Sequence, residues 1–351
     1  MAAGAALGLG RLAAAAGAGR GAGAGAGGRR ALAGAPSVGA AAVRALRAET
    51  GAPIGEVKAA LEAAGGSRAG ALEELRRRGL AAAQKKQGRA AREGAVAAVR
   101  GCAGGALAEV NSETDFAARD ERFQALALAA ARAVLATGAG GELGPAALRA
   151  LPLHGDGADA AALGGAGTVG DAEAWVGGQL REKVAVRRAE AVVSSPGGVV
   201  GVYTHAPLAP GVGAQGALVA LEGGDGGSEA DRVARQLAMH VAAAAPAHLA
   251  AVPPEALEAE RALLEEAALA QGKPAKVVPK VVEGQLRKWV RSQCLAQQPF
   301  VMDEDRSVAE VAEAHGLTLA GFARMKCGEG LEEAAAPDFA AEVAKTLGGQ
   351  A

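Results

Sequence analysis

Residues 109–123, EVNSETDFAARDERF, place a carboxylate and an aromatic ring side by side where a short apolar run gives way to a helix start. Three residue types that cap helix N-termini come first: Asn111, Ser112 and Thr114. Asp115 also suits the positive end of the helix dipole. Side chains on a first helical turn project from a tip and reach another molecule more readily than side chains in mid-helix. Asp115 and Phe116 are therefore candidates for a wedge that enters a partner.

The same segment has a second interpretation, in which the chain forms one helix from Asp115 to about Ala136. Four apolar residues then share one helical face, at spacings of seven, three and four: Phe116, Phe123, Leu126 and Ala130. Aromatic residues on such a stripe are mostly buried. Periodicity alone therefore favours Phe116 as the first core residue of an amphipathic helix.

Motifs for enzymatic chemistry are weak in this chain. Gly211, Gly213 and Gly216 match G-x-G-x-x-G, which by itself would suggest a nucleotide-binding oxidoreductase. The following residues 217–222, ALVALE, have the pattern of a strand, whereas a phosphate site needs a helix N-terminus there. The serines before Pro196 lack the glycines of a nucleophile elbow. An enzyme is the weaker class, and no cofactor is expected.

Composition narrows the class of protein further. The 351 residues suffice for two or three domains, and the many alanines with only two Trp, one Tyr and five Phe predict helices packed through Ala and Leu. A net charge of −1 predicts neither a nucleic-acid partner nor an anionic membrane surface. The three cysteines form no C-x-x-C pair and the five histidines no metal-ligand spacing, which predicts a reducing compartment and no metal site.

The beginning of the chain differs from the rest. Six arginines and no acidic residue precede Glu49, in a background of alanine and glycine. This composition predicts an organelle transit peptide over residues 1–40, with a disordered tail as the alternative. Because arginine dominates and serine is nearly absent, the mitochondrial matrix is favoured over the plastid stroma.

Two regions and a linker follow the predicted transit peptide. Residues 41–86 carry three short helical patterns separated by Gly51 and by two glycines at 65–66, which predicts a three-helix domain small enough to serve as a binding surface. Residues 87–94 are a basic linker. The remainder, residues 95–351, predicts an α+β core.

Within this core, strands precede a helix twice. Strand patterns at 95–101 and 106–111 come before the helix at Asp115, and a second set of three comes before a helix from Glu229 to Ala245: 184–193, 199–205 and 217–222. Glycine and proline between them are typical of antiparallel connections. The repeated order predicts two related α/β lobes with antiparallel sheets.

Residues 253–298 predict a helical hairpin that projects from the core. Its first arm is acidic, its second arm is basic, and Gly272-Lys273-Pro274 separates them. A further helix, a strand and a terminal helix beginning near Asp338 are predicted after the hairpin.

Several separate stretches resemble the elongation factor Ts family. They are RAETGAPIGEVKAALEAAGG in the three-helix region, EVNSETDFAARDERF, VRRAEAV, GVYTH, ARQLAMHVAAAAP, QGKP with VEGQLRKW, and QPFVMDED. The resemblance extends from about Val43 to the end of the chain. It implies a non-enzymatic guanine-nucleotide exchange factor that binds elongation factor Tu with GDP and promotes GDP release in translation elongation.

The resemblance also implies roles for particular residues. Thr114, Asp115 and Phe116 correspond to a tip that enters the GTPase domain of elongation factor Tu, where the ring separates helices and disturbs the magnesium and phosphate site. The three-helix domain, UBA-like in this family, touches the GTPase domain through two residues that correspond to Arg47 and Ile54. His205, in GVYTH, corresponds to a contact between the core and the partner.

One further implication, two departures and one alternative function accompany the resemblance. The long hairpin, as in bacterial members of the family, allows self-association. The chain departs from the family at REKVAVRRA, where Gly-Glu-Asn is more typical, and at Ile54-Gly55, where larger apolar residues are usual. The alternative function is a passive helical adaptor, which would bind a partner without changing nucleotide release.

Overall fold

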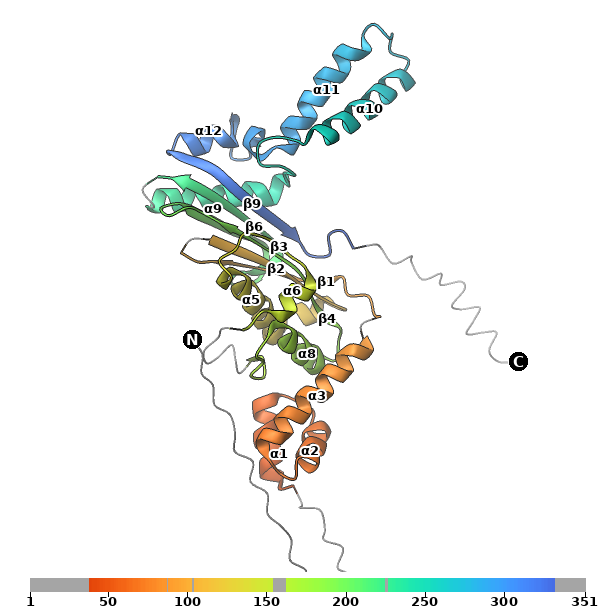
Figure 1. Cartoon of the computed structure of the whole chain (residues 1–351), viewed down its shortest axis with the longest axis vertical. Helices are drawn as coiled ribbons and strands as arrows, with labels where there is room; N and C mark the ends of the chain where they lie inside the picture. Colours follow the sequence, from red (N-terminus) through yellow and green to blue (C-terminus); the bar gives the residue numbers. More distant parts are fainter. Residues whose placement is uncertain (1–37, 87, 103, 154–161, 225–226, 332–351) are drawn as a thin grey trace, which may run out of the picture.

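The computed structural model of the chain describes residues 38–86, 88–102, 104–153, 162–224 and 227–331. The terminal helix predicted after Asp338 lies outside these residues, as does nearly all of the transit peptide predicted at 1–40. The described part is elongated, with three helices at one end, a seven-stranded antiparallel sheet in the middle and a helical hairpin at the other end (Figure 1). This mixture of helices and antiparallel sheet confirms the predicted α+β class.

The helices at the first end are α1 (Ala40–Thr50), α2 (Ile54–Ala63) and α3 (Arg68–Lys86). Gly51 ends α1 in the left-handed conformation, with φ 65°, and its N–H donates to the carbonyl of Arg47 at 2.7 Å. Their shared core consists of the apolar positions that recur at helical spacing: Leu46, Val57, Ala60, Leu61, Ala71 and Leu75. The long helix α3 continues from this small core towards the sheet (Figure 1).

The first half of the sheet contains β1 (Glu93–Arg100), β2 (Gly104–Ser112), β3 (Gly141–Leu143) and β4 (Val184–Val193). As predicted, β1 and β2 form an antiparallel hairpin. The sequence grouped residues 184–193 with the later strands, and this grouping was wrong, because β4 pairs with β2. Since β2 is buried at every residue, both of its edges need a hydrogen-bonding neighbour.

The second half contains β5 (Val199–Ala209), β6 (Val212–Gly223) and β9 (Leu317–Lys326). One edge of β6 pairs with β5, and the other edge pairs with β1 at Val212 and Gly213 and then with β9 from Gln215 onward. The strand β6 therefore joins both halves into one sheet, which bends so that the two halves face each other. Apolar side chains fill the space between the two halves: Val96, Ala98, Leu107, Val192, Val200, Leu218, Ala220, Ala323 and Met325.

The glycines of the G-x-G-x-x-G match serve strand packing. Residues 217–222 are part of β6, which confirms the strand interpretation. A Cβ on Gly213 would lie 2.5 Å from the carbonyl oxygen of His205, and a Cβ on Gly216 would lie 2.9 Å from Leu107 Cδ2. These positions exclude larger residues because neighbouring strands approach closely there.

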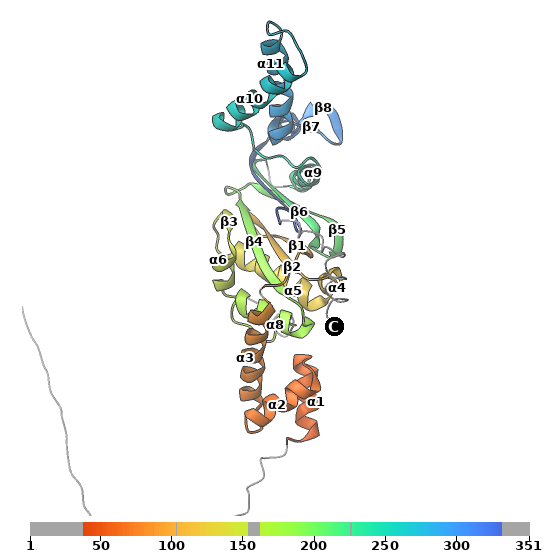
Figure 2. The same ribbon diagram turned by 90° about the vertical axis from the view of Figure 1, so that its right-hand side faces the viewer.

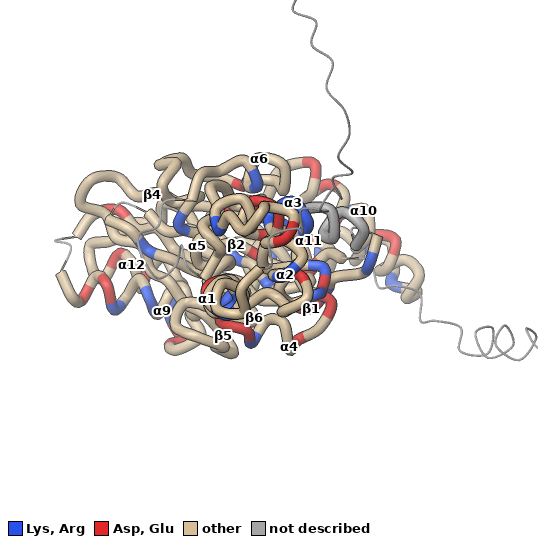
Figure 3. Tube along the Cα trace, turned by 90° about the horizontal axis from the view of Figure 1, so that it is seen from below, with Lys and Arg blue, Asp and Glu red and all other residues tan. Residues whose placement is uncertain are grey.

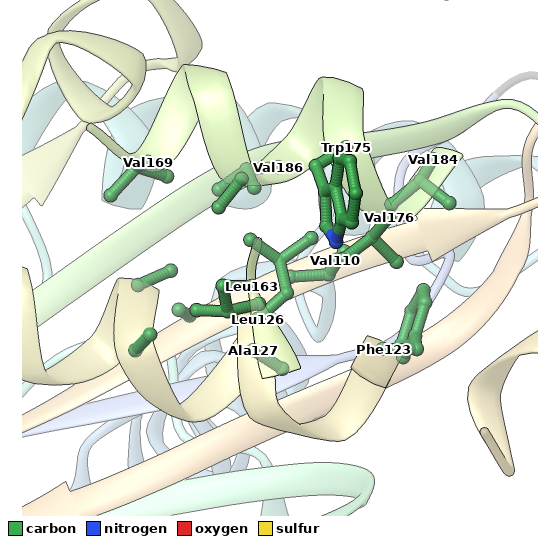
Figure 4. Close-up of a cluster of buried hydrophobic side chains, with 14 of the residues drawn as sticks. Val110, Phe123, Leu126, Ala127, Leu163, Val169, Trp175, Val176, Val184 and Val186 are labelled. Atoms are coloured by element: carbon green, nitrogen blue, oxygen red, sulfur yellow. The ribbon is translucent and has the colours of Figure 1, made fainter. Parts of the chain in front are cut away.

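Helices cover the outer faces of both halves. On the first half lie α5 (Glu121–Ala136), α6 (Pro145–Ala150) and α8 (Val169–Leu180). Figure 4 shows Phe123 and Leu126 of α5 gathered with Trp175 of α8 and with strand residues Val110 and Val186. The second half packs against α9 (Ser228–Ala244) and α12 (Val308–Glu313).

The hairpin at the far end consists of α10 (Pro254–Ala270) and α11 (Val278–Gln293). Its arms pack through Leu264, Ala268, Val278 and Val282. The chain returns to the core through a short 3-10 turn, Leu295–Gln297, and the small strands β7 (Pro299–Phe300) and β8 (Asp303–Ser307). Among the described helices, none is both long and apolar enough to cross a membrane.

One carboxylate lies deep in this packing. Glu109 of β2 is fully buried and accepts hydrogen bonds from Arg187 at 2.9 Å and from Arg188 at 2.6 Å, both on β4. It also accepts the N–H of Gly328, just beyond β9, at 2.8 Å. A single side chain therefore connects strands from both halves of the sheet.

Candidate functional site

Phe116 lies on a short helix, α4 (Asp115–Ala118), that is separate from α5. The sequence predicted one helix from Asp115 to about Ala136, but the structure interrupts it at Arg119 and Asp120. Asp120 starts α5 by accepting a hydrogen bond from the N–H of Arg122 at 2.9 Å. The core interpretation of Phe116 was therefore wrong: its side chain is 76% exposed, whereas Phe123 is fully buried.

The core of the protein holds the backbone of this tip in place. The hydroxyl of Thr114 donates to Glu182 Oε1 at 2.7 Å, and its N–H donates to Glu182 Oε2 at 3.1 Å. Thr114 thus occupies the cap position of α4 but uses its side chain as an anchor. Behind the exposed ring, Ala117 and Ala118 are buried.

The other two predicted capping residues belong to β2 instead. Ser112 is its last residue, and its hydroxyl donates to the carbonyl of Thr114 at 2.8 Å. Asn111 donates from Nδ2 to Glu109 Oε1 at 3.2 Å. The polar residues before the tip therefore stiffen the passage from strand to tip rather than the helix itself.

Glu182, which anchors the tip, was not singled out from the sequence. It follows Arg181, which ends α8 in the left-handed conformation with φ 58°. A non-glycine residue pays a steric cost of about 1–2 kcal/mol in that conformation. The sequence signal was the stretch REKVAVRRA, at which the chain departs from the family and of which Glu182 is the second residue. The neighbouring Lys183 donates its N–H to Glu113 at 2.5 Å, which adds a second tie beside the tip.

The charge at the tip is available to a partner. The carboxylate of Asp115 lies 3.5 Å from the guanidinium of Arg119, one helical turn away, and both side chains are more than half exposed. Exposed pairs of this kind are weak. Among the described residues, no group of three His, Cys, Asp or Glu side chains converges as a metal site would require.

Arg47 and Ile54 flank the turn between α1 and α2. Arg47 is exposed on α1, and Ile54, the first residue of α2, has 53% of its surface exposed. An isoleucine so exposed at the end of a helix is available to a second protein. Neither residue lies on the tip itself.

His205 is exposed on β5, and its Nδ1 lies 3.2 Å from the hydroxyl of Tyr203. It lines a cavity of about 460 Å³ together with Tyr203, Met239, Val301 and Met302. Val301 and Met302 are themselves 45% and 49% exposed, and sequence reasoning assigned them no role. Their only signal was their place inside the QPFVMDED stretch.

The elements that carry Arg47, the tip and His205 share one side of the molecule. The helices α1 and α4 and the strand β5 lie along the right-hand side of Figure 2, and α2 lies between α1 and α3. In Figure 3, α1, β5 and α4 lie in the lower half, where charges of both signs are interspersed. The structure therefore brings Thr114, Asp115 and Phe116 together at one tip. The elements with Arg47 and His205 occupy other points along the same side, and Ile54 lies on the neighbouring helix α2.

Comparison with known proteins identifies the family. The family model described as Elongation factor TS matches residues 113–329, more than half of the chain. Elongation factor Ts of Paramagnetospirillum magneticum is 41% identical over 317 residues, which cover 88% of this chain and 97% of that protein. A protein of Ostreococcus tauri named Elongation factor Ts, mitochondrial, is 41% identical over 324 residues, 87% of this chain and 91% of its own length. Elongation factor Ts of Gluconobacter oxydans is 41% identical over 314 residues, covering 88% and 98%. This chain belongs to the elongation factor Ts family.

Proposed function

We propose that this protein binds elongation factor Tu in its GDP-bound form and speeds GDP release during translation elongation. The observation that carries the proposal is the exposed ring of Phe116 on a helix whose backbone is fixed by Glu182. A large apolar side chain held in water by a rigid support is poised to bury itself in another protein. Membership of the elongation factor Ts family supports elongation factor Tu as that other protein.

The mechanism we propose is a thermodynamic coupling between two binding sites. If Phe116 binds the opened form of the GTPase better than the closed form, GDP binding must weaken by the same coupling free energy. Asp115 would bring a negative charge towards the bound phosphates, which acts in the same direction because like charges repel.

The wedge needs help from the remaining surface. Burial of one Phe side chain contributes roughly 1.5–3 kcal/mol, and each 1.4 kcal/mol corresponds to about tenfold in affinity. One ring therefore accounts for roughly ten- to hundredfold. We assign the remaining interaction to Arg47 and Ile54, which would touch the GTPase domain, and to His205, which would touch the partner at a further point.

We also propose that the protein acts in an organelle, in the mitochondrial matrix rather than the plastid stroma. The arginine-rich, acid-free composition of residues 1–40 supports this location, as does the relative whose name includes the word mitochondrial. Residues 1–60 fused to a fluorescent protein should enter mitochondria, and a cytosolic or plastid signal would contradict the proposal. Self-association through the hairpin stays a prediction, for which exposed Leu263 and Leu269 offer apolar surface.

Nucleotide release from the partner tests the proposed activity. Elongation factor Tu loaded with a fluorescent GDP is mixed in a stopped-flow instrument with excess unlabelled GDP and increasing amounts of the full chain. We expect the release rate to rise with the concentration of the chain and then to saturate. Binding without any change in the release rate would instead establish the passive adaptor.

A further inference from the structure

The three-helix region contacts the rest of the molecule first through α3, which crosses α8. Two glycines meet at this crossing: a Cβ on Gly178 would lie 3.6 Å from Gly79 Cα, and a Cβ on Gly79 would lie 3.6 Å from the carbonyl oxygen of Ala174. Close by, Arg76 of α3 forms an ion pair with Asp171 of α8. This contact fixes where α3 meets the core.

The second contact is at the turn between α1 and α2. A Cβ built on Gly51 would lie 3.3 Å from Gln179 Oε1 and 3.4 Å from Arg122 Nη1. Helices α8 and α5 of the core thus reach the turn that carries Arg47 on one side and Ile54 on the other. Because Gly51 adopts φ 65°, the turn fits closely only with glycine at this position.

A cavity lies between the two contacts. Its volume is about 380 Å³, and it is lined by residues from both sides, among them Ala52, Leu75, Trp175, Gly178 and Gln179. The three helices share a core and move as one unit, so the crossing of α3 with α8 alone would leave this unit able to tilt into the cavity. The approach of Gln179 and Arg122 to Gly51 lies away from that crossing and restricts such a tilt.

Arg122 connects this second contact to the tip. Its Nε and Nη2 donate to Asp120 Oδ1 and Oδ2 at 2.9 Å and 2.8 Å, which leaves Nη1 turned towards Gly51. Asp120 starts α5 and follows the tip helix α4 by two residues. The hydrogen bonds from Arg122 lower the pKa of the Asp120 carboxyl below its usual value, so the pair stays charged at neutral pH.

We propose that Arg122 is a positioning residue: it holds the turn with Arg47 and Ile54 at a fixed place relative to Phe116, so that both surfaces meet elongation factor Tu together. This inference rests on the proposed function for its consequence, but its geometry concerns this chain alone. Once the tip has bound, a turn held at a fixed place meets the partner at a high effective concentration. A turn that moves freely meets it at a lower one. Loss of Arg122 should therefore weaken binding of the partner more than it slows release at saturation.

A double-mutant cycle in the GDP-release assay tests the consequence. Arg122→Ala removes the guanidinium but keeps the backbone N–H that Asp120 caps. We expect Arg122→Ala and Ile54→Ala each to raise the half-saturating concentration about fivefold or more, with the saturated rate within about twofold of the unmodified chain. The half-saturating concentration of the double variant should be little higher than that of either single variant, because Arg122 acts through the turn that carries Ile54. Multiplicative losses, or a fall in the saturated rate alone, would overturn the proposal.

A distance measurement without any partner tests the geometry. Spin labels are placed at two exposed positions, Ala45→Cys on α1 and Ala136→Cys at the end of α5, with exposed Cys102→Ser as the background. We expect Arg122→Ala to broaden the distribution of distances between the labels. An unchanged distribution would refute the positioning role.

The matched control is Arg261→Ala, which removes an exposed arginine from the projecting hairpin and should change neither measurement. Circular dichroism and thermal unfolding verify that each variant is folded. The unmodified chain could fail to speed GDP release from elongation factor Tu while Arg122→Ala still broadens the distances between the labels. The proposed function would then fail and the positioning role would stand.

Discussion

Asp115→Ala combined with Phe116→Ala should remove most of the acceleration of GDP release, by roughly ten- to hundredfold at saturation, which corresponds to the 1.5–3 kcal/mol that one buried Phe contributes. The protein itself should stay folded. Both side chains are more than half exposed, so little packing is lost when they are removed, and the change in the free energy of unfolding should stay within about 0.5 kcal/mol. Much of the partner binding should also persist, because Arg47, Ile54 and His205 are untouched.

Stopped-flow release of fluorescent GDP measures the first effect, and chemical denaturation measures the second. Val193→Ala is the matched control, since Val193 is an apolar residue with 46% exposure at the end of β4 that lies away from the tip. It should leave the release rate unchanged. Full acceleration by the double variant would remove the wedge from the mechanism.

Glu109→Ala should have the largest effect on stability, a loss of about 3–5 kcal/mol in the free energy of unfolding. The variant leaves Arg187 and Arg188, whose side chains are each 23% exposed, without their shared counter-ion. It also leaves the N–H of Gly328 without its acceptor, in a region where unpaired groups are costly. The two halves of the sheet would lose a buried carboxylate that connects them.

Equilibrium denaturation followed by circular dichroism checks this prediction. Glu283→Ala is the control, because Glu283 pairs with Arg287 at 3.1 Å on the hairpin but both side chains are at least 70% exposed. Exposed pairs contribute at most about 1 kcal/mol. Equal losses for the two variants would show that the buried cluster contributes no more than a surface pair.

Most of the secondary structure followed from patterns in the sequence. The helices α1, α2, α10 and α11 follow from apolar spacing and from their glycine and proline boundaries. The strands follow from runs of small and β-branched residues. The pairing of strands did not follow from the sequence, because residues in runs such as 184–193 and 199–205 do not indicate which strand lies beside them in the sheet. Only the complete burial of β2 explains why β4 lies beside it.

Helical periodicity predicted the candidate site less well than it predicted the helices. The spacing from Phe116 to Phe123 suits one helical face only if the helix is continuous, and Asp120 starts a new helix between them. Resemblance to the family pointed to the exposed tip, whereas Glu182, which is 68 residues from Thr114 in the chain, could be recognised as its anchor only in three dimensions.

The tip helix α4 has only four residues, far fewer than an isolated helix needs to persist in water. Its shape is imposed from outside, by hydrogen bonds to Glu182 and by the burial of Ala117 and Ala118. If the tip docks as proposed, the backbone of this chain loses almost no conformational entropy, and the rearrangement would fall on the GTPase. In this sense the proposed exchange factor would act as a template that the partner must deform to match.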